Sequence, residues 1–80
     1  MNKTTSLNDI KIGEKAKVIT VKSKGSIRRR LLDIGLTENT VVECVGKSPL
    51  GDPSAFLIRG AVIALRSEDS KNILVLKRSD

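Results

Sequence analysis

Hydrophobic residues recur at a helical spacing in only one stretch of this chain, residues 25–35. Ile27, Leu31 and Ile34 stand at positions i, i+4 and i+7, so they share one face of a helix, and Leu32 widens that face. We therefore predict a single short helix over this stretch.

The ends of this helix carry their own signals. Ser26 is placed as an N-cap whose hydroxyl can accept from the free amides of the first turn, and Gly35 supplies the left-handed residue that commonly follows a helix. Arg28, Arg29 and Arg30 occupy the first turn, where the helix dipole favours anions over cations. This unfavourable placement indicates either packing of the long arginine stems or a use for their charge.

Every other clear signal indicates strands or turns. Runs rich in β-branched and aliphatic residues predict strands at residues 15–22, 40–47, 55–59, 61–66 and 73–77. Gly60 predicts a tight hairpin or bulge, and the loop over residues 48–54 contains two prolines and a glycine. Short helical turns are expected at residues 6–10 and 67–72, capped by Ser6 and Ser67. Residues 1–6 are expected to be disordered, and residues 78–80 to fray.

These elements predict a mainly β protein, a small barrel of about five strands with one short α-helix between strands one and two. Closure of the sheet would remove the free strand edges that can pair with other chains. The chain of 80 residues is the size of one small domain, which we place over residues 1–80 with an ordered core of about residues 7–77.

The net positive charge of the chain indicates an acidic partner. Fifteen basic residues against nine acidic residues give a net charge of +6, and the stretch from Lys11 to Arg30 holds only one acid, Glu14. Such a field favours nucleic acid, an anionic membrane surface or an acidic protein face. Phe56 is the only aromatic residue, which argues against stacking of single-stranded nucleic acid.

Candidate chemistry is sparse. The chain has no histidine, a single cysteine (Cys44) and no glycine-rich phosphate loop, so we expect no enzymatic activity, no cofactor and no metal site. Cys44 is expected to be a buried and inert strand residue. The absence of a disulfide framework, of a long apolar run and of a signal peptide favours a cytosolic protein.

Several motifs stand in a specific order and spacing along the chain, at residues 7–13, 16–18, 29–36, 40–42, 49–53, 58–60, 63–66 and 73–75. This order and spacing resemble the FeoA family. This resemblance implies an SH3-like β-barrel without enzymatic activity that supports ferrous iron uptake in the cytoplasm, at the inner face of the membrane, through a FeoB-type transporter or its cytosolic G-protein domain. The same module occurs at the C-terminus of DtxR-type metal-dependent repressors.

Two groups of residues are the candidate partner-binding sites. The first is a basic docking face formed by Lys22, Lys24, Arg28, Arg29 and Arg30. The second is an apolar patch formed by Leu50 and Phe56 around the proline-rich loop; in the alternative interpretation Phe56 fills the barrel core.

Other uses of the basic face stay open at this point. One arginine could reach a nucleotide phosphate of the partner as an arginine finger, or Arg30 could simply pair with Asp33. The face could also bind nucleic acid, as in a metal-regulator module, or associate with a membrane surface. The resemblance makes nucleic acid an unexpected partner and implies membrane association only through the transporter.

Overall fold

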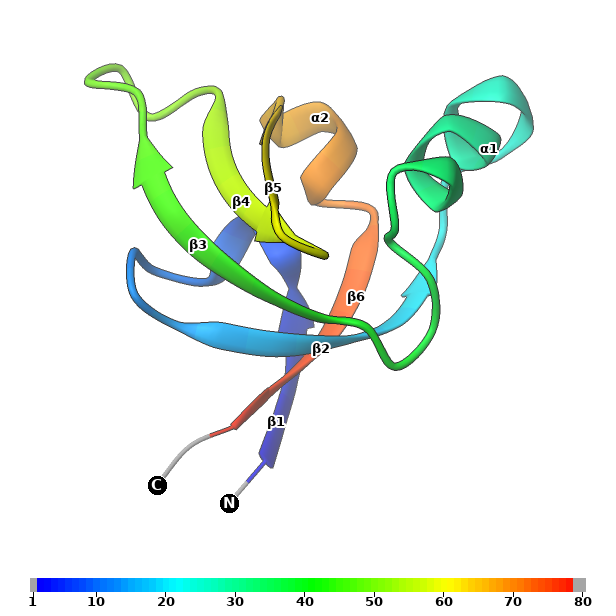
Figure 1. The fold of residues 1–80 in the computed structure, drawn as a ribbon, viewed down its shortest axis with the longest axis horizontal. Coiled ribbons are helices and arrows are strands. Elements are labelled where there is room, and N and C mark those ends of the chain that lie inside the picture. Colours follow the sequence, from blue (N-terminus) through cyan, green and yellow to red (C-terminus); the bar gives the residue numbers. More distant parts are fainter. Residues whose placement is uncertain (1, 79–80) are drawn as a thin grey trace.

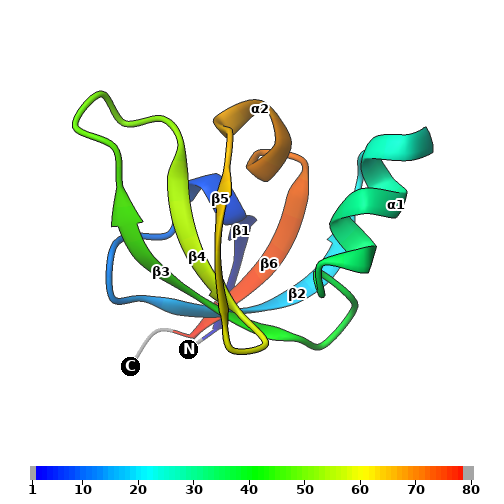
Figure 2. The ribbon, with the colours of Figure 1, turned by 45° about the horizontal axis from the view of Figure 1, so that its top comes forward.

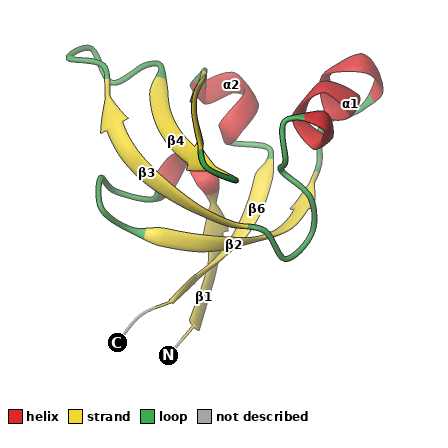
Figure 3. Ribbon diagram, viewed as in Figure 1, coloured by secondary structure: helices red, strands yellow, loops and turns green. Residues whose placement is uncertain are grey.

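Six antiparallel strands form one strongly bent sheet in the order β1-β6-β2-β3-β4-β5 (Figures 1 and 2). The computed structural model describes residues 2–78. The elements are β1 (Asn2–Ser6), the 3-10 helix η1 (Leu7–Asp9), β2 (Lys15–Val21), α1 (Gly25–Asp33), β3 (Val41–Lys47), β4 (Ser54–Ile58), β5 (Ala61–Leu65), α2 (Ser67–Ser70) and β6 (Ile73–Arg78). The mainly β architecture and the helix between the first two predicted strands, β2 and β3, are confirmed (Figure 3).

The sheet is a barrel that stays open along one side. β1 and β5 end the hydrogen-bonded order, so within residues 2–78 the ladder is not closed and the closure expected from the sequence is absent. Register shifts between Val18 and Thr20 and between Cys44 and Gly46 mark irregularities where β2 and β3 bend.

The concave side of the sheet encloses one hydrophobic core. Alternate residues of β4 are buried, as a half-buried strand requires. Phe56 is 1% exposed and lies in this core, which confirms the interpretation that it fills the barrel. The other core residues are Leu7, Ile10, Ala16, Val18, Val21, Leu31, Leu36, Val42, Cys44, Ile58, Leu65, Ile73 and Val75.

The first strand was not foreseen. Residues 2–6 form β1, which pairs with β6 from Asn2↔Arg78 to Ser6↔Leu74, so the expected disorder is wrong for these residues. Their sequence is polar and lacks the alternation of a half-buried strand, but β6 offers them a free edge. Arg78 pairs with Asn2 at the end of β6, so the fraying expected there is wrong. Met1, Ser79 and Asp80 lie outside the described residues, as does the fraying expected at the last two.

Helix α1 ends as predicted but begins differently. Its N-cap is Lys24 rather than Ser26, and no side chain caps its first turn. At the other end the amide of Gly35 donates to the carbonyl of Leu32 (3.0 Å), and the amide of Leu36 donates to the carbonyl of Leu31 (3.1 Å). With Gly35 at φ +110°, this is a Schellman closure, and its apolar pair, Leu31 and Leu36, is fully buried.

Two local predictions hold, and one is corrected. β4 and β5 form a two-residue hairpin in which Arg59 (φ +50°) and Gly60 (φ +85°) both have positive φ, as a type I′ turn requires. Ser6 caps η1 by accepting from the Asn8 amide (3.1 Å). Ser67, however, does not cap α2, because the N-cap is Arg66.

Helix α2 receives its cap from a distant loop instead. The Asp52 carboxylate accepts from the Ser67 backbone amide (2.8 Å) and from the Ser67 hydroxyl (3.3 Å). The β3–β4 loop is therefore fastened to α2 by one aspartate.

The two ends of the described chain lie side by side. Asn2 pairs with Arg78, and both ends leave the barrel on the side away from α1 and α2 (Figure 1). Within residues 2–78, no helix has the length and apolar character needed to cross a membrane.

Candidate functional site

The basic residues of the predicted docking face lie on α1 and on the loop that leads into it. A backbone hydrogen bond from the Lys22 amide to the carbonyl of Asn72 (2.7 Å), the residue before β6, fixes the start of this loop. α1 projects beside the barrel, and in both views it lies at one side of the molecule (Figures 1 and 2). The five residues of the docking face, all of them exposed, are Lys22, Lys24, Arg28, Arg29 and Arg30.

Only part of the α1 face predicted to be apolar is buried. Leu31 is fully buried, Ile34 and Leu32 are half-buried against the core, and Ile27 is 44% exposed. Residues 25–30 at the start of α1 are therefore all exposed, and the arginines among them are open to solvent.

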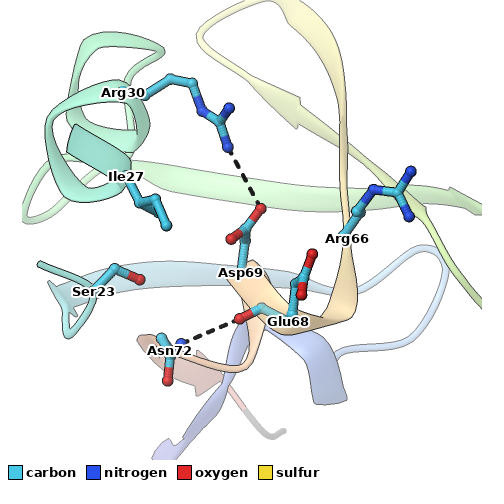
Figure 4. A pocket seen from close by; sticks show the side chains of 7 residues that line it. All are labelled: Ser23, Ile27, Arg30, Arg66, Glu68, Asp69 and Asn72. Carbon is cyan, nitrogen blue, oxygen red and sulfur yellow. Dashed lines mark hydrogen bonds and ion pairs between the residues drawn. The ribbon is translucent and has the colours of Figure 1, made fainter. Parts of the chain in front are cut away.

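Arg30 forms an ion pair that the sequence did not predict. Its Nη2 lies 3.6 Å from Asp69 Oδ2 on α2, so Asp33 is not its partner (Figure 4). The Arg30 side chain is 66% exposed, while that of Asp69 is 16% exposed. An ion pair this open to water contributes little stability, but it orients the guanidinium across the space between the two helices.

A groove of about 490 Å³ lies between α1 and α2. Figure 4 shows its lining, with Arg30 and the apolar Ile27 on the α1 side and the acidic Glu68 and Asp69 on the α2 side. The remaining lining residues are Ser23, Arg66 and Asn72. Both charge signs meet here, so this groove is less basic than the outer side of α1.

A second hollow of about 330 Å³ lies between α1 and β5. It shares Arg30, Arg66 and Asp69 with the first, but its floor is apolar. The apolar lining residues are Leu31 and Ile34 from α1 and Ile63, Ala64 and Leu65 from β5.

Arg28 and Arg29 are the most available charges of the docking face. No ion pair or hydrogen bond of their side chains occurs within residues 2–78, and both are exposed. The structure thus leaves two adjacent guanidinium groups for an external acidic group, while Arg30 is already engaged.

The apolar pair predicted around the proline-rich loop does not form a patch. Leu50 is 93% exposed at the tip of the β3–β4 loop, whereas Phe56 points into the core. This loop and α1 lie on opposite sides of the molecule in both views (Figures 1 and 2). The seven candidate residues therefore fall into three places: the α1 face, an isolated loop tip and the core.

A second ion pair lies away from the candidate surface. Lys77 Nζ lies 2.9 Å from Glu14 Oε2, and Glu14 Oε1 also accepts from the Lys11 amide (2.6 Å). The hydrogen bond to Lys77 and then the Lys11 amide hold the pKa of Glu14 below its ordinary value of 4.5. This pair fastens the turn before β2 to the end of β6.

The described residues offer little covalent or metal chemistry. Within residues 2–78, no three His, Cys, Asp or Glu side chains come together in a way that could hold a metal ion. Cys44 is buried, with its thiol directed at the Gly46 carbonyl (3.7 Å).

Sequence reasoning missed Asp69, Asp52 and Arg59. The contacts that matter join residues far apart in the chain: Arg30 with Asp69, Asp52 with Ser67, and Arg59 with Thr37. No local periodicity encodes such pairs, although the two positive-φ residues at 59 and 60 follow from a hairpin between adjacent strands.

Comparison with known proteins gives one consistent result. The FeoA domain model matches residues 5–77. A fusion of Fe(2+) transport protein A with the Fe(2+) transporter FeoB from Porphyromonas gingivalis is 30% identical over 69 residues. This match covers 86% of the chain but only 8% of that much longer protein.

Solved structures agree in fold. The solution structure of a FeoA-like protein from Clostridium acetobutylicum is 36% identical with a TM-score of 0.88, covering all of this chain and 93% of the other. FeoA from Stenotrophomonas maltophilia, solved with zinc and described as an SH3 domain protein, is 27% identical with a TM-score of 0.79, covering 89% and 88%. The expected SH3-like fold is thereby confirmed.

Metal-dependent repressors share the fold as well. A manganese-dependent transcriptional repressor aligns with a TM-score of 0.83 at 15% identity, covering 98% of this chain and 44% of the repressor. At that identity the likeness concerns the fold alone.

Proposed function

This chain belongs to the FeoA family of non-catalytic accessory domains, and from that premise we propose that it supports ferrous iron uptake by binding the cytosolic side of a FeoB-type transporter. On this proposal the chain acts in the cytoplasm, at the inner face of the membrane, and reaches that membrane only through its partner. Iron passes through the transporter and not through a site on this chain.

One observation carries the proposal: in the Porphyromonas gingivalis relative, the FeoA segment and FeoB are parts of the same polypeptide. A covalent link holds two modules at a high effective concentration, which is useful when the modules must contact each other. When the two modules are separate chains, the contact between them needs affinity of its own.

We place that affinity on the exposed side of α1. Arg28 and Arg29 are exposed and free of ion pairs within the described residues, and Lys22 and Lys24 add to the same positive field. Charges at the rim of an interface chiefly raise the association rate and make binding depend on salt. The partner surface is therefore expected to be acidic.

The test is an amide titration of the isotope-labelled chain with the soluble cytosolic domain of a FeoB-type transporter from the same organism. Shifts are expected to cluster on residues 22–30 at moderate salt. The double substitution Arg28→Glu/Arg29→Glu is expected to weaken binding by about tenfold or more, because it replaces attraction with repulsion.

The matched control changes the same total charge elsewhere. Lys3→Glu/Lys17→Glu alters two exposed lysines of β1 and β2 and is expected to weaken binding much less. Equal losses for the two double variants would mean that only net charge matters and would contradict an α1 docking face. The absence of any shift with the cytosolic domain would contradict that domain as the partner, and duplex DNA would be titrated next.

A further inference from the structure

We propose that β5 is a docking edge to which an extended, acid-flanked segment of a partner polypeptide adds as a further strand. β5 stands at the end of the hydrogen-bonded order, with no neighbour on its outer side within residues 2–78. This inference concerns a surface other than the arginine side of α1 and does not depend on which protein is the partner.

The backbone of β5 carries unused hydrogen-bonding groups. The two-residue hairpin makes Ile58 and Ala61 a mutually hydrogen-bonded pair, and such pairs recur at every second residue of an antiparallel ladder. Ala61, Ile63 and Leu65 therefore direct their amides and carbonyls at β4. Those of Val62 and Ala64 point away from β4, toward the position of an added strand.

This edge lacks the usual features that prevent strand pairing. Its sequence, Ala-Val-Ile-Ala-Leu, holds no charge and no proline, and its pairing with β4 runs without a register shift. Val62 is 65% exposed. The opposite edge, β1, is polar and carries Lys3, which is a common way to discourage pairing. Of the two edges, β5 is the one built to accept a strand.

The hollow between α1 and β5 provides the space and sets the chemistry of the added strand. A paired strand lies about 4.8 Å from its neighbour, which places it within this hollow of about 330 Å³. Ile34 lines it on the α1 side, and Ile63 and Ala64 line it on the β5 side. Alternate side chains of the incoming segment would meet these groups, so we expect apolar residues at every second position.

Charge favours acidic flanks. Arg59 precedes β5 and Arg66, which lines the hollow, follows it, and both are exposed. Asp69 is already paired with Arg30. A second copy of this chain would bring the same arginines and another net charge of +6 to the edge, so self-pairing is disfavoured.

The test uses a defined probe, the peptide acetyl-Asp-Glu-Val-Thr-Val-Thr-Val-Glu-Asp-amide, titrated into the full isotope-labelled chain. The largest amide shifts are expected at Val62 and Ala64, with slowed hydrogen exchange of both. Methylation of the peptide amides that face β5 is expected to weaken binding by about tenfold or more, because it blocks the new ladder without changing charge. Replacing the acidic flanks of the peptide by lysines is expected to weaken binding as well. The difference in affinity between the two peptides should shrink as salt is added.

A variant of the protein gives an independent readout. Val62→Pro removes only an amide that points away from β4, a position where an edge strand tolerates proline, so the fold is expected to persist while peptide affinity falls by about tenfold.

Three outcomes would overturn the proposal: equal binding of the methylated peptide, shifts confined to residues 22–30, or no shift at about 1 mM peptide. Amide shifts of β5 that depend on protein concentration in the absence of peptide would show that the edge pairs with a second copy of the chain. That result would overturn the proposal that an acid-flanked segment binds there. Each of these results would overturn the β5 proposal without contradicting the α1 docking face, so the two proposals fail separately.

Discussion

The side chain of Arg59 crosses so close to Gly35 that a Cβ atom at position 35 would lie 2.9 Å from Arg59 Cδ. The Arg59 guanidinium continues to the hydroxyls of Thr37 (3.0 Å) and Thr40 (3.4 Å). The β4–β5 hairpin is thus fastened to the segment that leaves α1. The helix carrying the arginines is positioned by this contact as well as by its own packing.

Gly35→Ala is expected to lower the free energy of unfolding by more than a backbone effect alone. Its φ of +110° strains any other residue by about 1–3 kcal/mol, and the new Cβ would also press on Arg59 Cδ and on Ile58 Cγ2 (3.0 Å). Urea unfolding followed by circular dichroism measures the loss.

Gly25→Ala is the matched control for this prediction. Gly25 also has a positive φ, +66°, but its Cβ would meet nothing within 4 Å. Only the backbone strain remains, so the loss in the free energy of unfolding should be smaller than for Gly35→Ala. Equal losses would show that the crossing of Arg59 over Gly35 contributes nothing.

Asp52→Ala is expected to destabilise the protein by about 1 kcal/mol, because the Ser67 amide at the start of α2 loses its acceptor. Asp52→Asn keeps an oxygen that can accept the same bond and should retain more of the stability. Thermal unfolding of both variants checks this order, and a larger loss for the asparagine variant would contradict the capping role.

Stability is expected to fall at acidic pH through Glu14. The pKa of this carboxyl is lower in the folded than in the unfolded chain, so its contribution is fully present above about pH 4.5 and is lost as the pH falls through the folded pKa. Glu14→Gln should have a lower melting temperature than the parent protein at pH 7, and the difference between the two melting temperatures should narrow as the pH is lowered. A gap that is constant from pH 7 to about pH 3 would exclude this titration as its source.

Leu50→Ser and Phe56→Leu should have different effects on stability, because Leu50 lies on the surface and Phe56 in the core. Leu50 is 93% exposed, so its replacement should change the free energy of unfolding by no more than about 0.5 kcal/mol. Phe56 is 1% exposed, and the smaller leucine should cost about 1–2 kcal/mol. If Leu50 contacts the transporter, Leu50→Ser will weaken that binding without changing the melting temperature.

Local patterns predicted most of the fold because local interactions determine those elements. Helix α1, its closure at Gly35 and the hairpin at Gly60 each depend on a few neighbouring residues. β1 was missed because its polar sequence shows no periodicity, and its strand state comes from the free edge of β6. Ser26 is not the N-cap because α1 begins at Gly25, two residues earlier than a helix capped by Ser26 would begin.

The sequence predicted which basic residues belong to the candidate site, but not how their side chains are arranged and paired on the surface. The run of arginines was evident, and their exposure followed from the helical period. The choice of Asp69 over Asp33 for Arg30 depends on where the fold places α2 relative to α1, which no pattern within α1 records. The pairing of Leu50 with Phe56 failed for a related reason: sequence proximity did not reveal that one side chain faces the core and the other the solvent.

The adjacent ends of the described chain bear on how such a domain can be joined to a larger protein. A linker attached next to Asn2 or Arg78 would leave from the side of the barrel away from α1 (Figure 1). Covalent attachment at either end therefore leaves both the arginines and the β5 edge uncovered. A fused domain and a separately expressed domain therefore present the same two surfaces to a partner. They differ mainly in the effective concentration at which the partner meets those surfaces.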